Sequence, residues 1–263
     1  RPAPLGAGDW EYALFNCYAA GVYVRDVSPG GAYVLAATGG HNCPPNVGAA
    51  LFDFADATWK RIDNTNGVPW RTGDYGPSEV NSELELSIAG ATPNAVPAPF
   101  HTYQLLAELP TARGGGPRGS VITVVTQFGT TSANSNSRSH RFDLATGAWS
   151  RLSTNAAGLT GFTSIRDAVA NRIYLLPSEI HAVHQLSWLD GADWTWKTTS
   201  FSDWPATDGN NNTSFIEPSA HLLVMLSSTQ HLRAIELDAI ATGVHQLNVT
   251  GTLPTFWFWM LKE

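Results

Sequence analysis

The sequence predicts an all-β protein, a β-propeller built of four-stranded antiparallel blades. The first observation is a repeat, in which an aspartate is followed six positions later by a large apolar residue at Asp53, Asp143, Asp190 and Asp238. The last two intervals between these aspartates match the length of one blade, whereas the first is about twice as long. The second observation is composition: glycine (24) and proline (16) are plentiful, and only 14% of residues are charged, which favours turns and short strands over long helices.

Residues 20–62 contain the clearest repeat unit. Short runs rich in β-branched and aromatic residues alternate there with turn residues, such as Ser28-Pro29-Gly30-Gly31, whose proline and glycines suit a tight hairpin. The unit predicts an antiparallel meander of four strands. We expect these strands at residues 22–24, 32–36, 49–54 and 59–62.

The repeated aspartate and the tryptophan that follows it have a structural explanation. At the end of a strand, an aspartate carboxylate accepts hydrogen bonds from turn N–H groups two residues further on. The tryptophan opens the outer strand, and its ring is expected to pack between neighbouring blades. We therefore interpret both as structural rather than catalytic residues.

Three further units follow. Four blades can therefore be identified in the sequence, of the five to seven that are expected. The second has predicted strands at residues 100–103, 120–125, 140–143 and 149–152. The third has them at residues 161–165, 172–176, 184–188 and 194–197, and the fourth at residues 213–216, 221–226, 232–237 and 244–247.

A single domain over residues 1–263 is expected. The stretch 63–99 is either a long insertion or a degenerate blade, because loops of this length without secondary structure are uncommon. The segments 10–15 and 256–261 are expected to complete a closing blade jointly, and residues 256–261 are apolar at every position, as in a strand buried on both faces. The alternatives are that residues beyond Glu263 have been lost, or that the end strands belong to a larger assembly.

Three motifs carry a resemblance to a known family. The Gly39-Gly40 pair, the strand ending in Phe52-Asp53 and the tryptophan at Trp59 resemble kelch repeats, over about residues 20–62 and 100–250. Within the galactose-oxidase and kelch-like superfamily, the chain is most similar to uncharacterised bacterial kelch-like proteins, in which a Gly-Gly-His segment precedes a His-Thr-Tyr segment, here residues 39–41 and 101–103. The resemblance implies a protein-binding scaffold, a carbohydrate-associated domain or, rarely, an oxidase.

Composition and missing motifs argue against several functions. The net charge is -7, with only three lysines and no basic stripe, which disfavours nucleic-acid binding. No apolar run reaches the ~20 residues that span a bilayer. The sequence lacks a G-x-S-x-G elbow and an H-E-x-x-H pair, and His181 and His184 would face opposite sides of a strand. We therefore expect no catalytic residue, no metal and no cofactor.

Six residues are candidate ligand contacts. His41, Asn42, His101 and Tyr103 flank predicted inner strands, where they could converge at one mouth of a central channel. Trp70 and Trp204 lie in predicted loops, where exposed aromatic rings suit sugar stacking or a protein anchor. The alternative is structural: the polar residues cap turns, and the tryptophans pack between blades.

Two other features leave alternatives open. Asp74, Glu79, Glu83 and Glu85 belong to a segment without clear periodicity, where they form a cation or sugar site or, as we favour, a solvated charged loop. Cys17 and Cys43 are either two buried thiols or one disulfide.

The sequence as a whole predicts a non-enzymatic binding module for a protein or glycan partner. Low lysine content, loops rich in Asn, Ser and Thr, and two isolated cysteines favour an extracellular, cell-surface or virion location. One alternative is a structural component of a virion or surface appendage, such as a phage tail or capsid-associated protein. A second is a copper or carbohydrate-active oxidase of the galactose-oxidase type.

Overall fold

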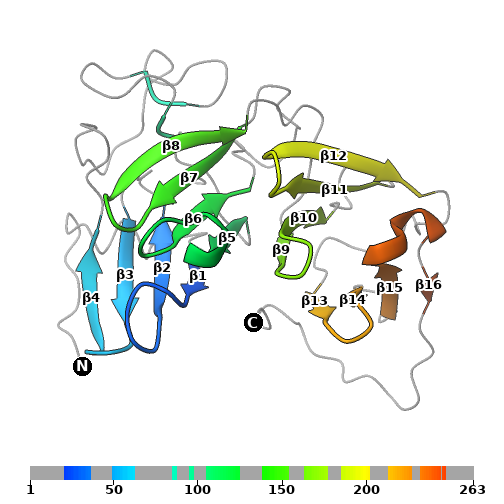
Figure 1. The fold of residues 1–263 in the computed structure, drawn as a ribbon, viewed down its shortest axis with the longest axis horizontal. Helices are drawn as coiled ribbons and strands as arrows, with labels where there is room; N and C mark the ends of the chain where they lie inside the picture. The colour runs from blue at the N-terminus through cyan, green and yellow to red at the C-terminus, as the bar shows by residue number, and fades with distance from the viewer. Residues whose placement is uncertain are drawn as a thin grey trace, which may run out of the picture. The chain divides into compact units, whose positions relative to one another are not determined.

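Four antiparallel four-stranded sheets make up the described part of the chain (Figure 1). The computed structural model describes residues 21–36, 49–62, 85–87, 95–97, 105–124, 138–153, 163–176, 185–201, 213–226, 232–243 and 245–246. The sheets confirm the predicted all-β class and the four-stranded blades of a β-propeller. The chain divides into two compact units, Arg1–Leu159 (unit 1) and Thr160–Glu263 (unit 2), and each contains two of the sheets.

Unit 1 contains blades 1 and 2, and in each blade the strands pair in chain order, as expected for a meander. Blade 1 consists of β1 (Gly21–Val24), β2 (Ala32–Ala36), β3 (Ala49–Asp53) and β4 (Thr58–Arg61). Blade 2 consists of β5 (Leu106–Leu109), β6 (Ser120–Thr123), β7 (Ser139–Asp143) and β8 (Ala148–Ser153), with the short 3-10 helix η2 (Thr111–Arg113) between β5 and β6. The inner strand β1 packs against β5 and β6.

Residues 100–103, where blade 2 is predicted to begin, lie outside the described residues, and the first strand of its described sheet is β5. The run Leu105-Leu106-Ala107-Glu108-Leu109 has no β-branched residue and carries a charge in its middle, so its pattern does not indicate a strand. In the structure Glu108 is buried. Its carboxylate accepts hydrogen bonds from the backbone N–H (2.9 Å) and Nε (3.2 Å) of Arg25, which follows β1.

Unit 2 contains blades 3 and 4. Blade 3 consists of β9 (Thr163–Asp167), β10 (Arg172–Leu176), β11 (Gln185–Asp190) and β12 (Thr195–Ser200). Blade 4 consists of β13 (Thr213–Glu217), β14 (Leu222–Leu226), β15 (Leu232–Glu236) and β16 (His245–Gln246), with the 3-10 segment η4 (Leu237–Thr242) before β16.

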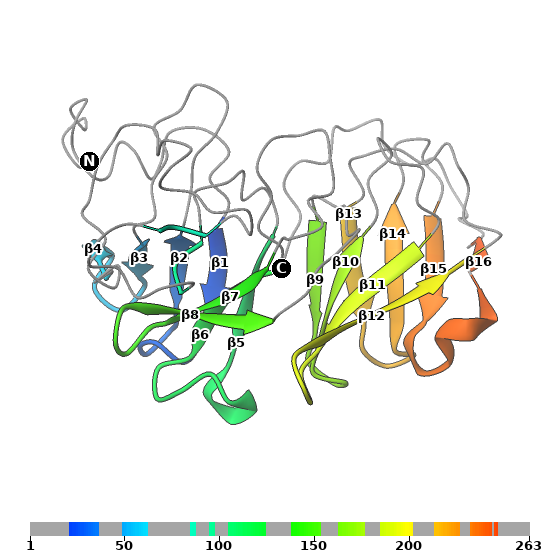
Figure 2. The ribbon, with the colours of Figure 1, turned by 90° about the horizontal axis from the view of Figure 1, so that it is seen from above.

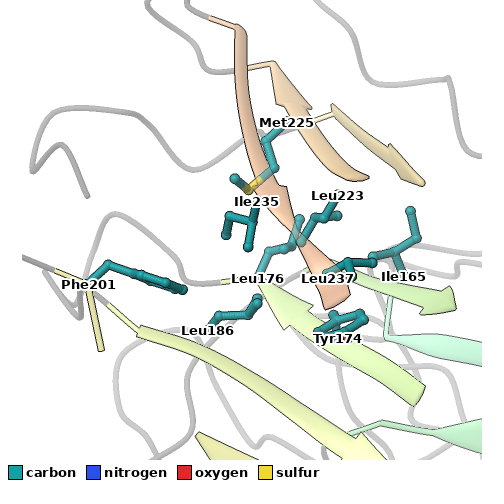
Figure 3. Packing of buried hydrophobic residues seen from close by; sticks show 9 residues of the cluster. All are labelled: Ile165, Tyr174, Leu176, Leu186, Phe201, Leu223, Met225, Ile235 and Leu237. Carbon is teal, nitrogen blue, oxygen red and sulfur yellow. The ribbon is translucent and has the colours of Figure 1, made fainter. Parts of the chain in front are cut away.

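The core of unit 2 is formed by apolar side chains from both of its blades (Figure 3). Tyr174 and Leu176 of β10 belong to the same buried cluster as Leu223 of β14 and Ile235 of β15. Each of these four side chains is at most 1% exposed, and burying a side chain of this size stabilises a fold by ~1.5–3 kcal/mol. The alternating apolar positions of the strands thus hold blades 3 and 4 together.

Five hairpins share one turn, which lies at the same end of the blades within each unit (Figure 2). An acidic residue ends the first strand, and its carboxylate accepts a hydrogen bond of 2.8–3.2 Å from the N–H two residues later. The residue four positions after the acid has a positive φ. The pairs are Asp53 and Ala57, Asp143 and Gly147, Asp167 and Asn171, Asp190 and Trp194, and Glu217 and His221.

The turn role predicted for the repeated aspartate is therefore confirmed at Asp53, Asp143 and Asp190. Asp238 differs, because it lies in η4 and its carboxylate contacts the ring of His221. The predicted packing of the tryptophans is most complete at Trp149, which is 2% exposed, whereas Trp59 and Trp196 are half-buried.

Two short pieces of the 63–99 stretch are described, and they pair with each other. Glu85 forms a β-bridge with Pro97, and the N–H of Leu86 donates to the carbonyl of Val96 (3.0 Å). Leu86, Ala95 and Val96 are all buried. The end segments 10–15 and 256–261 lie outside the described residues, and so do Cys17 and Cys43. The structure contains no helix long and apolar enough to cross a membrane among the residues it describes.

Candidate functional site

All six candidate ligand contacts fall outside the described residues: His41, Asn42, Trp70, His101, Tyr103 and Trp204. The same holds for His181, His184, Asp74, Glu79 and Glu83. Among the acidic residues of residues 71–85, the structure therefore describes Glu85 alone. The residues that can be considered for a functional site are therefore those of the described strands and hairpins.

Glu85 is not part of a solvated charged loop, because its side chain is fully buried in unit 1. Arg151 donates to Glu85 Oε1 through Nε (2.8 Å) and also pairs with Oε2. His140 Nε2 lies 2.9 Å from Glu85 Oε1. The prediction of a solvated charge is wrong for Glu85, because these partners on β7 and β8 replace water around the carboxylate.

The charges of this cluster follow from its burial. Burial acts to raise the pKa of Glu85, but the hydrogen bonds from His140 and Arg151 outweigh it and hold the pKa below its usual value of 4.5. Burial lowers the pKa of His140 below its usual value of 6.5, despite the hydrogen bond to Glu85. A neutral imidazole donating from Nε2 to an ionised Glu85 satisfies both groups. The cluster therefore anchors the Glu85 segment to blade 2.

Blade 1 carries a row of four aromatic side chains, one from each strand. Tyr23 pairs with Tyr33, Tyr33 with Phe52, and Phe52 with Trp59 in the registers of the three strand pairs. Directly opposed residues of antiparallel strands point to the same face of a sheet. The rings of Phe52 and Trp59 lie 5.3 Å apart, and Phe54 adds a fifth ring 5.4 Å from Phe52 and 6.0 Å from Tyr23. We call these five residues the aromatic face.

The aromatic face is open to solvent. Tyr23 is 47% exposed, Tyr33 39% and Phe54 49%. The opposite face of the same sheet is buried, since Val34 and Leu51 stand opposite each other there and are at most 2% exposed. Blade 1 thus uses one face for the core of unit 1. On the other face Leu35 and Ala50 are buried beside Trp59, whereas Tyr23, Tyr33 and Phe54 are exposed.

Glycines hold the two tyrosine rings in place. The hydroxyl of Tyr33 accepts a hydrogen bond from the N–H of Gly21 (3.2 Å), and a Cβ at Gly21 would collide with the Tyr33 ring. The hydroxyl of Tyr23 donates to the carbonyl of Gly30 (3.0 Å), and a Cβ at Gly31 would collide with Tyr23. Covering a strand glycine with a neighbouring aromatic ring is a known way of fixing register. These hydrogen bonds and close contacts hold both tyrosine rings against blade 1.

Blade 2 has a matching row that is buried. The register places Glu108, Val121, Phe142 and Trp149 opposite one another, and none of them is more than 6% exposed. Blade 1 lies over this row, because Glu108 binds Arg25 and because β1 packs against β5 and β6. The aromatic face of blade 1 occupies the equivalent position on its own sheet, where Tyr23, Tyr33 and Phe54 are exposed and no described strand of another blade packs against β3 or β4.

The chemistry of the aromatic face suits binding. It offers aromatic rings with two tyrosine hydroxyls and no nucleophile paired with a base. In the part of the chain that the structure describes, no group of three or more His, Cys, Asp or Glu side chains is placed to hold a metal ion. Fixed, half-exposed aromatic rings are typical anchors of interfaces.

The sequence contained two signals that point to this face. Tyr23 and Tyr33 stand at equal distances from Ser28 in the β1–β2 turn, so that a tight hairpin brings them opposite each other. Asp53-Phe-Ala-Asp-Ala-Thr-Trp-Lys60 returns as Asp190-Gly-Ala-Asp-Trp-Thr-Trp-Lys197, which fixes the β3–β4 register and hence the Phe52–Trp59 pair. No sequence signal shows that Tyr23, Tyr33 and Phe54 remain exposed.

No protein-family model matches the chain, and a search of curated proteins finds no match. The resemblance to kelch repeats therefore rests on the motifs of the chain alone.

Proposed function

We propose that this protein is a non-enzymatic binding module and that the aromatic face of blade 1 is the surface that contacts its partner. The observation that carries the proposal is the exposure of Tyr23, Tyr33 and Phe54 (39–49%) at a place where the matching residues of blade 2 are buried. Contiguous exposed apolar surface of this kind marks interaction sites in soluble proteins. Because the tyrosine rings are already fixed, binding costs little side-chain entropy.

A protein partner is favoured over a glycan. The matching row of blade 2 is covered by protein, namely blade 1. Both tyrosine hydroxyls already take part in hydrogen bonds within blade 1, which leaves fewer polar groups to recognise sugar hydroxyls. Neighbouring rings are also inclined, with Tyr23 and Phe54 at 47° and Phe52 and Phe54 at 82°, so they form no flat platform for a sugar ring.

The kelch identity and a location outside the cytoplasm or on an assembled particle belong to the same proposal. Support comes from the kelch-like motifs in residues 39–59 and from the low lysine content. A binding module with an uncovered aromatic surface fits such a setting, since its partner would be a neighbouring protein.

The test uses ligands selected on the purified full-length chain. Peptides from a random phage-display library and glycans on an array are bound to the wild type, and the best ligands are then measured against Phe54→Ala and Tyr33→Ala. Phe215→Ala is the matched control, because Phe215 is 52% exposed on β13 of unit 2. Thermal melting of each variant checks that it is folded.

We expect selected peptides to lose about tenfold or more in affinity in the two blade 1 variants, or ~1.4 kcal/mol, and to bind Phe215→Ala as they bind the wild type. Selected glycans that show this pattern would overturn the preference for a protein partner. Ligands that bind all three variants equally well would place the binding surface elsewhere and contradict the proposal.

A further inference from the structure

A histidine in unit 2 lies between two carboxylates that belong to different blades. His221, in the turn between β13 and β14, has Nε2 2.9 Å from Asp167 Oδ2, at the end of β9 in blade 3. Its Nδ1 lies 2.7 Å from Asp238 Oδ1, in η4 of blade 4. The side chain of Asp167 is fully buried, whereas that of Asp238 is 82% exposed.

The two contacts together specify the charge of the ring. Ionised carboxylates only accept hydrogen bonds, and a neutral imidazole has a single N–H to donate. Donation to both Asp167 and Asp238 therefore requires the doubly protonated imidazolium. The other oxygen of Asp167 already accepts the N–H groups of Val169 (2.8 Å) and Ala170 (3.2 Å), so the buried carboxylate depends on His221 for its countercharge.

The turn conformation of His221 is shared by the equivalent residues of the other hairpins. Its φ of 48° lies in the left-handed region, as does the φ of Ala57, Asn171 and Trp194. The equivalent position of the β7–β8 turn is occupied by Gly147, at a φ of 69°. The backbone of this turn places the ring of His221 in contact with two blades.

We propose that Asp167, His221 and Asp238 form a proton-operated clamp that holds η4 of blade 4 when His221 is charged and releases it when His221 is neutral. The neutral ring keeps one N–H, and this stays with Asp167, because a buried carboxylate without a partner is costly. Asp238 faces solvent, so water replaces its lost hydrogen bond. The contact that breaks when His221 loses its proton is therefore the one with Asp238 in η4.

The segment η4 leads into the outer strand of blade 4. Among the described residues, β16 pairs with β15 at Arg233 with Gln246 and at Ala234 with His245. Loss of the Asp238 contact thus removes one of the constraints on the outer edge of blade 4.

Other titratable groups near the clamp lie in the same turn and on the neighbouring strands. In the same turn as His221, the carboxylate of Glu217 accepts N–H groups from Ser219 and Ala220. Arg172 of β10, opposite Asp167 in register, lies 3.5 Å from Asp190, and Tyr174 of β10 is held in the core of unit 2. Glu236 of β15 pairs in register with Leu222. The groups whose hydrogen bonds act on His221 are Asp238 and Asp167.

The direction of the pH response follows from these contacts. Burial of His221 acts to lower its pKa, but the hydrogen bonds to Asp238 and Asp167 outweigh it and raise the pKa above its usual value of 6.5. A group whose pKa is higher in the folded than in the unfolded state stabilises fully below the unfolded value. The clamp is therefore closed below pH 6.5 and opens as the pH rises through the higher pKa of folded His221.

The experiment combines NMR titration of His221 with hydrogen exchange of residues 237–243 in the full chain, from acid to mildly alkaline pH. Exchange rates are corrected for the intrinsic dependence of amide exchange on pH. Asp238→Ala removes the exposed carboxylate together with any hydrogen-bond partner for Nδ1, and leaves the buried pair intact. His245→Gln is the matched control, because His245 is an exposed histidine on β16 of the same blade.

In the wild type and in His245→Gln, we expect His221 to titrate above pH 6.5 and corrected exchange in residues 237–243 to rise several-fold through that titration. In Asp238→Ala, the pKa of His221 should fall and exchange should be high at every pH. Corrected exchange that does not change through the titration of His221, or a pKa of His221 unchanged by Asp238→Ala, would overturn the clamp.

Discussion

Blades 1 and 2 carry the same aromatic pair in two different environments. The rings of Phe52 and Trp59 in blade 1 lie 5.3 Å apart at 55°, and those of Phe142 and Trp149 in blade 2 lie 5.0 Å apart at 56°. Phe142 and Trp149 are at most 2% exposed, whereas Phe52 and Trp59 are only half-buried. The repeated motif therefore determines ring geometry, and the neighbouring blade determines whether the pair belongs to the core or to the surface.

The residues around each pair match these environments. In blade 2, Glu108 occupies the row position that Tyr23 holds in blade 1, and its charge is matched by Arg25. Blade 1 has no buried charge in its row. The two rows share the Phe–Trp pair and differ on the first two strands, where Tyr23 and Tyr33 stand in place of Glu108 and Val121. One repeat can therefore supply either a buried packing surface or an exposed aromatic surface.

The largest expected difference between the two blades is the loss of unfolding free energy when each tryptophan is replaced by alanine. We expect Trp149→Ala to lower the free energy of unfolding by ~3–5 kcal/mol, because it empties a fully packed site. Trp59→Ala should cost only about 1–2 kcal/mol, since its ring is half-buried. Urea unfolding followed by far-UV circular dichroism measures both. Equal losses would mean that the aromatic face is covered in solution.

The hairpins could be predicted because their signals are local. The aspartate of each turn binds an N–H two residues away, as Asp53 does with Ala55, and the strand registers follow from such turns. Glu85 could not be placed, because its partners His140 and Arg151 lie far along the chain. Strand β5 was hidden for a similar reason, since the partner of Glu108 is Arg25 on another blade.

The candidate site was harder to predict than the fold. Tyr23 and Tyr33 are of a residue type that is common at interfaces. Their exposure, however, depends on which segments of the chain pack over them, and no short sequence pattern encodes this packing. The aromatic residues singled out from the sequence, Trp70 and Trp204, lie outside the described residues. Their role stays a prediction.

A smaller effect comes from the turn between the third and fourth strands of each blade. Gly147 has a φ of 69° and Ala57, at the same position in blade 1, a φ of 55°. We expect Gly147→Ala to destabilise the protein by ~1–2 kcal/mol, the cost of the left-handed conformation. Ala57→Gly relieves that cost but adds ~0.4–1 kcal/mol of unfolded-state entropy, so it should stabilise slightly. Thermal melting measures the stability of both variants. A loss of stability in Ala57→Gly would show that the turn of blade 1 is not strained.

The smallest effect concerns the aspartates of the same turns. In blade 1, Lys60 Nζ lies 2.8 Å from Asp53 Oδ2, whereas blade 2 has Ser150 at the position of Lys60. Hydrogen bonds from Lys60, Ser28 and the N–H of Ala55 lower the pKa of Asp53 from 3.8 to about 2. We expect Lys60→Ser, which copies blade 2, to raise this pKa towards 3.8, as measured by carbon-detected NMR titration of the carboxylate.

The sign of the accompanying stability change follows from the same titration. Because the pKa of Asp53 is lower in the folded state, its contribution is present above the unfolded value of 3.8 and is lost as the pH falls through about 2. Lys60→Ser should therefore lose less stability than the wild type on acidification over this window. An unchanged pKa in Lys60→Ser would mean that Ser28 and Ala55 alone hold the charge. The ion pair of blade 1 would then add nothing to the turn that the two blades share.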